Sequence, residues 1–103
     1  MIYELRTYTC KPGTVQTVLD LWEKEGQAML APYFTMAGQW VTETGTANQI
    51  VTLWAFKDMN HRQQARADLM KHPGFPEYLA RCRACYVHQE SVFLSPTALS
   101  PIQ

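Results

Sequence analysis

Hydrophobic and polar residues alternate at the start of the chain, in IYELRTYT (residues 2–9). A period of two is typical of a β-strand, because successive side chains point to opposite faces of a sheet. The pattern therefore predicts a first strand whose even-numbered residues share one face. These residues are Ile2, Glu4, Arg6 and Tyr8.

A helical pattern follows a break at KPG (11–13). Pro12 is well placed to open a helix, because its fixed φ suits the first helical turn. Apolar residues then recur every three or four positions, which indicates an amphipathic helix. They are Val15, Val18, Leu19, Trp22 and Met29. Gly26 and Pro32 are expected to kink or end this helix.

The rest of the chain alternates between strand and helix signals. Two strands flank the loop TGTA, which predicts a hairpin, and Asp58 can cap the helix that follows. HPGFP interrupts that helix before it resumes, and a last strand precedes a Pro-containing tail. The ranges are strand 34–43, loop 44–47, strand 48–56, helix 59–71, interruption 72–76, helix 77–84 and strand 85–94.

The resulting order is β-α-β-β-α-β, which predicts an α+β fold of ferredoxin-like type. Its four strands would form one antiparallel sheet, with the helices on one face and the first strand between the third and fourth. We expect a single domain over residues 1–103, with a core of 1–95 and a C-terminal tail of 96–103.

Both faces of this sheet would carry large apolar side chains. In the third strand the two sets are Val51, Leu53, Ala55 and Ile50, Trp54, Phe56. Two helices cover only one face, and a bare face bearing Trp54 and Tyr86 would be a large apolar patch of a kind that monomers seldom expose. We therefore expect a homodimer in which the second copy covers this face and the two sheets enclose a barrel-like cavity.

Composition excludes several classes of function. Nine basic residues balance nine acidic ones, so no positive field exists to hold nucleic acid. No apolar run approaches the length of a membrane span, and the alternating N-terminus, which carries Glu4, does not resemble a signal peptide. A soluble, cytoplasmic protein is the expectation, and three cysteines, an odd number, suit reduced thiols.

CRACYVH (82–88) has the Cys-x-x-Cys spacing of redox and metal sites. However, Cys82 lies near the end of a predicted helix, whereas a redox cysteine needs the helix N-terminus to favour its thiolate. Cys82, Cys85 and His88 also fall short of the four ligands of structural zinc. We interpret both cysteines as small core residues and predict no metal site.

Several chemically useful side chains should instead converge on the bare face. They are Glu4, Arg6, Tyr8, Thr52, Trp54, Tyr86, His88 and Glu90. Histidine is the side-chain type best suited to act as a base near neutral pH, so His88, Glu90 and Arg6 form the predicted catalytic set, with Arg6 binding an anion produced by His88. The others would bind substrate. Alternatively, Glu4 and Arg6 only form a buried ion pair, and Trp54 and Tyr86 are dimer core.

Two further substrate-binding candidates lie around the hairpin. With a strict four-residue loop, Val41 faces Ile50 and Trp40 turns toward Val51 and the helices, whereas a bulge would bring Trp40 into the cavity. Asn48 stands at the strand entrance, where it serves the turn or reaches a ligand. The second helical region carries several basic residues, which we interpret as a helix face exposed to solvent. They are Arg62, Arg66, Lys71, Arg81 and Arg83.

Four blocks make the chain resemble the NIPSNAP family of the dimeric α+β barrel superfamily. They are YELRTYTCKPG (3–13), WVTETGTANQIVTLWAF (40–56), FKDMNHR (56–62) and QESVFL (89–94). Thr52 departs from the family pattern, which often has histidine there, so a base at that position is not expected. The resemblance implies a ferredoxin-like protomer and a homodimer. The wider superfamily includes cofactor-independent monooxygenases, isomerases and haem-degrading enzymes.

Two hypotheses of function follow. The first is an enzyme acting on a small, partly apolar molecule, as a cofactor-independent monooxygenase or an isomerase. The second is a non-catalytic ligand-binding or protein-interaction module. No cofactor is predicted, and a haem-binding variant would use His88 as its axial ligand.

Overall fold

The computed structural model describes residues 1–103, and its elements follow the predicted β-α-β-β-α-β order. Three short helical elements, α1, η1 and α2, run on continuously as one helical segment. The elements are β1 (Ile2–Cys10), α1 (Val15–Leu21), η1 (Trp22–Gly26), α2 (Gln27–Leu30), β2 (Thr35–Val41), β3 (Gln49–Phe56), α3 (Met59–Met70), α4 (Phe75–Arg83) and β4 (Tyr86–Leu94).

Local turn chemistry moves some of the predicted boundaries. The first helix begins at Val15 rather than at Pro12, because Gly13 adopts a left-handed φ of 85° that ends the turn after β1. The hairpin loop is also longer than four residues, since β2 ends at Val41 and β3 starts at Gln49. Asn48 has a φ of 62° at this entrance, which supports the turn role considered for it.

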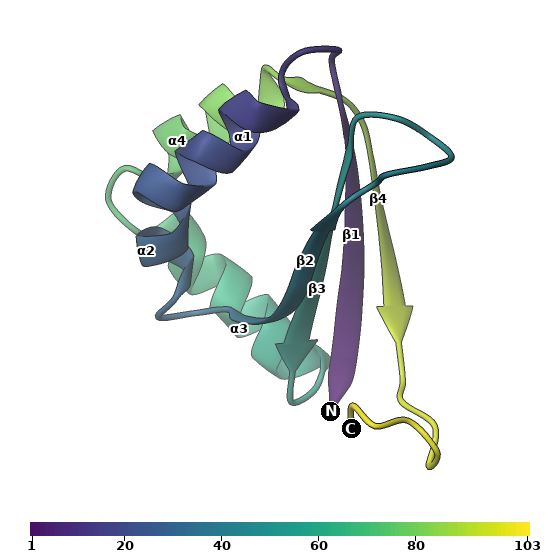
Figure 1. Cartoon of the computed structure of the whole chain (residues 1–103). Coiled ribbons are helices and arrows are strands. Elements are labelled where there is room, and N and C mark those ends of the chain that lie inside the picture. Colours follow the sequence, from purple (N-terminus) through teal and green to yellow (C-terminus); the bar gives the residue numbers. More distant parts are fainter.

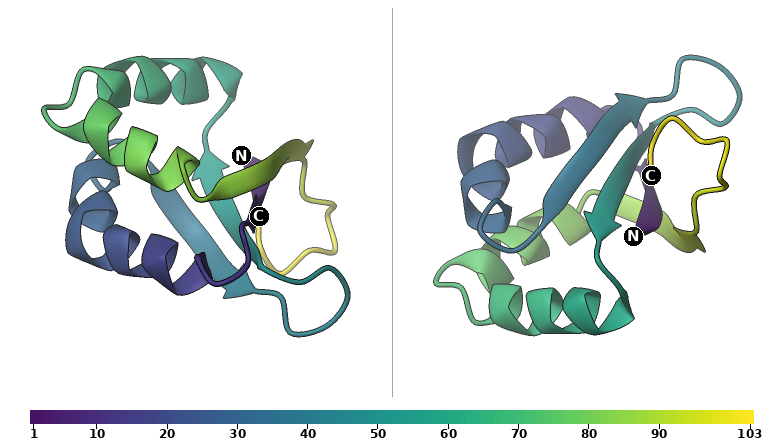
Figure 2. Two further views of the ribbon diagram at one scale, coloured as in Figure 1. Left: turned by 90° about the horizontal axis from the view of Figure 1, so that it is seen from above. Right: turned by 90° about the horizontal axis from the view of Figure 1, so that it is seen from below.

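The four strands form one antiparallel sheet in the order β2-β3-β1-β4. This confirms the predicted topology, with β1 between β3 and β4. All the helices lie on one side of the sheet, as Figures 1 and 2 show from three directions. No helix covers the other side, which we call the bare face, and only the C-terminal tail reaches it, at Tyr3. The two chain termini lie close together, and the Tyr3 hydroxyl donates a hydrogen bond to the carbonyl oxygen of Gln103.

The helices cover the face that was predicted to be bare. Ile50, Thr52, Trp54 and Phe56 are all at most 6% exposed, because α3, α4 and the first helical segment pack over them. The face assignment from the sequence was therefore wrong. Strand alternation separates two sets of side chains but does not say which set meets the helices, and in β3 both sets are apolar.

A β-bulge in β4 splits the residues that were predicted to share a face. Thr9 pairs with His88, but Cys10 pairs with Tyr86, so one extra residue, Val87, enters β4. The bulge turns Tyr86 toward the helices and leaves His88 on the bare face. The prediction that Tyr86 and His88 share a side was therefore wrong.

The first helical segment contains a π-helical turn, η1, where it approaches α4. Gly26 in this turn is buried, and a Cβ atom built there would come within 2.2 Å of the Tyr78 hydroxyl and 2.8 Å of the Trp22 ring. Only glycine therefore permits this close approach. The π-turn and Gly26 together determine how deeply Trp22 and Tyr78 reach toward the sheet.

Gly26→Ala should therefore destabilise the fold by about 1–3 kcal/mol, the usual cost of overpacking. Gln27→Ala, at the exposed neighbouring position, is the matched control and should change the free energy of unfolding by less than about 0.5 kcal/mol. Urea denaturation measures both values. Equal stabilities for the two variants would show that the contact between Gly26 and Tyr78 is not tight in solution.

Candidate functional site

A cavity of about 130 Å³ lies between the sheet and the helices. Its volume is similar to the roughly 150 Å³ of an apolar protein cavity that holds benzene, so it has room for a molecule the size of one ring. Most of its lining is apolar, and aromatic side chains contribute its walls; they are Trp22, Phe34, Trp54, Phe75, Tyr78 and Tyr86. Its polar lining consists of Arg6, Tyr8, Gln39, Thr52, Arg66 and Arg83.

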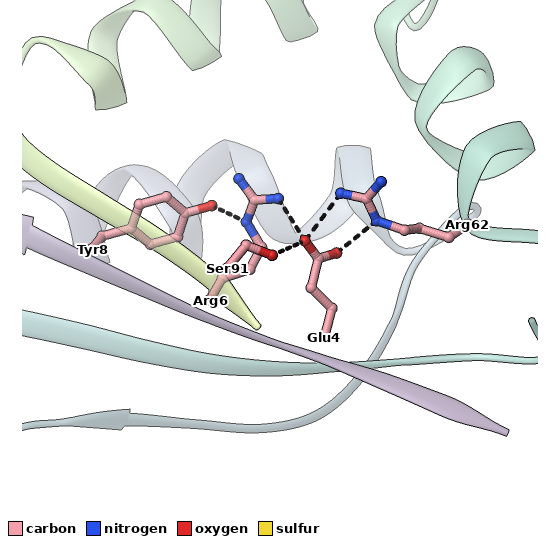
Figure 3. Close-up of polar contacts among 5 residues, drawn as sticks. All are labelled: Glu4, Arg6, Tyr8, Arg62 and Ser91. Atoms are coloured by element: carbon pink, nitrogen blue, oxygen red, sulfur yellow. Dashed lines mark hydrogen bonds and ion pairs between the residues drawn. The ribbon is translucent and has the colours of Figure 1, made fainter. Parts of the chain in front are cut away.

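Beside this cavity a buried carboxylate, Glu4, ties β1 to α3 and β4 (Figure 3). The Nε and Nη2 atoms of Arg62 donate to the two oxygens of Glu4, both at 3.0 Å. Arg6 Nη1 donates to Oε2 at 3.0 Å, and Ser91 Oγ donates to the same oxygen at 2.5 Å. Glu4 is 0% exposed, so these four hydrogen bonds replace its hydration.

The electrostatics of this network favour the charged carboxylate. Burial alone would raise the pKa of Glu4, but hydrogen bonds from Arg62 and Ser91 and the charges of Arg6 and Arg62 outweigh it, so the pKa lies below its usual value. Glu4 therefore stays ionised and is not a base for chemistry near neutral pH.

The same network orients Arg6 at the edge of the cavity. Its Nε atom donates to the Tyr8 hydroxyl at 2.6 Å, and Nη1 is held by Glu4. The Tyr8 ring is in turn stacked on Tyr86, with ring centroids 4.5 Å apart. Because its neighbours hold it on two sides, Arg6 presents its guanidinium in a fixed position.

The cavity offers hydrogen-bond donors and positive charge but no base. Burial raises the pKa of the Tyr78 and Tyr86 hydroxyls and of the Cys82 thiol, so all three keep their protons near neutral pH. No carboxylate or histidine is among the residues that line the cavity. The arrangement therefore suits a molecule that accepts hydrogen bonds or carries negative charge.

Six of the predicted site residues lie together on the helix-covered side of the sheet. Glu4 is beside the cavity, and the others line it: Arg6, Tyr8, Thr52, Trp54 and Tyr86. Their convergence was predicted, but on the opposite side of the sheet from the one expected.

The other four predicted residues lie elsewhere. His88 and Glu90 point to the bare face, with side chains 60% and 65% exposed and His88 Nε2 3.1 Å from Glu90 Oε1. Trp40 pairs with Val51, as a bulge-free hairpin predicted, but this places it on the bare face rather than against the helices. Asn48 lines a shallow pocket at the hairpin loop. The predicted placement of His88 and Glu90 beside Arg6 is therefore wrong.

The interpretation of the sequence also missed residues of this candidate site that lie on the helices. Arg62 and Arg66 were interpreted as part of a solvated face, yet Arg62 binds buried Glu4 and Arg66 lines the cavity. Arg62 stands three residues before buried Ala65 and Arg66 three residues before buried Leu69, and this spacing was the available signal. Gln39, which donates to Thr52 Oγ1 at 3.3 Å, was also missed, although the predicted hairpin register, with Val41 opposite Ile50, already places it opposite Thr52.

The fold is a ferredoxin-like α+β fold with one four-stranded antiparallel sheet. SnoaB, a cofactor-independent oxygenase from Streptomyces nogalater, matches it with a TM-score of 0.69 at 17% identity, over 97% of this chain and 96% of SnoaB. At this identity the likeness shows the fold alone.

No helix has the length and hydropathy needed to cross a membrane.

The family model and relatives of higher sequence identity establish the family of this chain. Residues 3–101 match the NIPSNAP family model, so the chain belongs to the NIPSNAP family. An uncharacterized NIPSNAP domain protein from Burkholderia xenovorans is 36% identical, with a TM-score of 0.93 over 98% of this chain and 99% of that one. Protein NipSnap homolog 2 from Danio rerio is 28% identical over 99% of this chain, which spans 35% of that protein's length.

The Glu4 network should dominate the stability of the fold. Glu4→Gln removes the buried negative charge and leaves Arg6 and Arg62 uncompensated, at a cost of about 3–5 kcal/mol in the free energy of unfolding. Glu25→Gln is the control, because Glu25 pairs with Arg81 at the surface, where an ion pair contributes little. Urea denaturation of both variants at pH 7 tests this difference.

The pH dependence provides a second readout of the same network. The folded-state pKa of Glu4 is lowered, so its stabilisation is complete above the pKa of the unfolded chain, about 4.3. That stabilisation disappears as the pH falls through the lower, folded-state value. The wild type should lose this contribution in acid, whereas Glu4→Gln should lack it. Parallel curves of stability against pH for the two proteins would contradict the assignment.

Proposed function

We propose that this protein binds a small, partly apolar molecule in the cavity between its sheet and its helices. The observation that carries the proposal is the cavity itself: aromatic walls surround a ring-sized space, and a few polar groups, Arg6 among them, are part of its lining. Apolar walls with a few convergent polar groups are the usual composition of a small-molecule site. Arg6, Tyr8 and Thr52 would orient the ligand, and Trp54 and Tyr86 would form walls.

We also propose that the protein is a homodimer joined through the bare face of its sheet. That face remains apolar although it is not the one first expected. Trp40 is 54% exposed and Val92 51% exposed, and β3 adds Val51 and Leu53 beside them. Exposed apolar side chains on neighbouring strands favour burial against a second copy.

A cofactor-independent oxygenase or isomerase is the catalytic form of this proposal. Arg6 and the protonated hydroxyls of Tyr78 and Tyr86 would stabilise negative charge that develops on a substrate oxygen. Because no base lines the cavity, such a substrate must ionise readily by itself. The alternative is binding without turnover, and chemical alteration of a bound compound would distinguish the two.

Filling the cavity should abolish ligand binding. Leu79 lines the cavity, so Leu79→Trp should occupy the space that the ligand needs. Leu99→Trp makes the same substitution at a tail residue that is 94% exposed. In a thermal-shift screen of ring-sized compounds, some should raise the Tm of the wild type and of Leu99→Trp but not of Leu79→Trp. A screen in which no compound raises the wild-type Tm would contradict the proposed function.

A charge on the bare face should prevent dimer formation. Native mass spectrometry of the wild type should give twice the protomer mass of 11.8 kDa. Val92→Lys should give the protomer alone, because it would bury an unpaired charge in the interface. Met59→Lys, at an exposed position on α3, should remain dimeric. A wild-type protein that is monomeric, or a dimeric Val92→Lys variant, would be evidence against this interface.

A further inference from the structure

The charges near one end of the cavity do not balance. Arg6, Arg62 and Arg66 come together there, and Glu4 is the only carboxylate that pairs with any of them. Three guanidinium groups against one carboxylate leave an excess of two positive charges. Solvent screens part of this excess, and an anion bound among the three groups would offset it further.

Two of these arginines also have hydrogen-bond donors that the protein does not use. Arg6 Nη2 makes no hydrogen bond, whereas Nε and Nη1 do. No buried polar side-chain atom is without a partner, so Nη2 is accessible to solvent, and Arg6 lines the cavity. Arg66 lines the same cavity and takes part in none of the ion pairs.

Arg66 stands four residues after Arg62 on α3, so both side chains lie along the same side of the helix. Although solvent reaches Arg66, partial burial and the positive charges of Arg62 and Arg6 lower its pKa. Arg66 therefore presents to solvent and to the cavity a guanidinium that no acid of this chain pairs with.

We propose that Arg6 and Arg66 form an anion-binding pair, and that the ligand of the cavity carries an anionic oxygen group on a single apolar ring. This inference rests on the proposed function and adds the class of ligand to it. Guanidinium groups bind carboxylates through paired, charge-assisted hydrogen bonds. The ring would occupy the aromatic part of the cavity, and its carboxylate, enolate or phenolate would lie between the two arginines.

Benzoate and benzyl alcohol test this directly, because they share a ring and differ in charge. Isothermal titration calorimetry should show that benzoate binds the wild type at least about tenfold more tightly than benzyl alcohol, a difference typical of a charge-assisted hydrogen bond. Arg66→Gln should weaken benzoate binding by about tenfold and leave benzyl alcohol unchanged. Lys71→Gln removes the same charge at the end of the same helix but outside the cavity, so it should bind benzoate as the wild type does.

The stability of the ligand-free variants separates this role from a structural one. Arg66→Gln should have a Tm equal to or above that of the wild type, because it relieves repulsion from Arg62 and Arg6. A lowered Tm would mean that Arg66 is a structural residue and would overturn its assignment. Equal effects of Arg66→Gln and Lys71→Gln on benzoate binding would overturn it as well.

The affinities of benzoate and benzyl alcohol test the anion-binding pair and the cavity separately. If both probes bind with similar affinity, the cavity is a ligand site but the anion-binding inference is wrong. If neither probe binds, the anionic single-ring ligand is wrong, and the thermal-shift screen of ring-sized compounds decides separately whether the proposed function fails too. Tighter binding of benzoate that depends on Arg66 supports both.

Discussion

The fold is organised around a carboxylate that no water reaches. An ionised group in this position is tolerated only when charged or polar partners replace its hydration. Glu4 on β1 obtains its partners from α3 through Arg62, from β4 through Ser91 and from its own strand through Arg6. The guanidinium of Arg62 also lies 4.9 Å from the centre of the Phe93 ring of β4. One buried charge therefore determines how α3 meets the sheet.

This constraint also shapes the cavity. Because Glu4 holds Arg6 and Arg62, α3 is fixed on the sheet at a point beside the cavity, and Arg66 follows one turn later at the cavity edge. Across the cavity, Gly26 allows the side chains of Trp22 and Tyr78 to lie close against the backbone of the first helical segment. Rigid aromatic side chains on one side and an ion-pair network on the other leave a space that neither fills. The cavity is thus a consequence of packing that is tight on both sides of it.

Much of the arrangement could be predicted from the sequence, and the errors have specific physical causes. Alternation in β1 and β3 correctly grouped Glu4, Arg6 and Tyr8 with Thr52 and Trp54. It could not assign that group to a side, since both faces of β3 are apolar. The error at His88 has another cause: a bulge at Val87 inserts one residue between the paired positions, and no glycine or proline marks it.

Arg62 and Arg66 show a second reason why the sequence alone did not predict the whole site. The four-residue spacing of Arg62 and Arg66 is visible in the sequence, but arginines on a helix usually face water. What overrides that tendency is Glu4, which is far away in sequence and needs a positive partner inside the fold. Once Arg62 satisfies Glu4, the next arginine on the same side of α3 has no acid left to pair with. Natural proteins retain unpaired groups of this kind mainly where function requires them, and Arg66 lies at the edge of the cavity between the sheet and the helices.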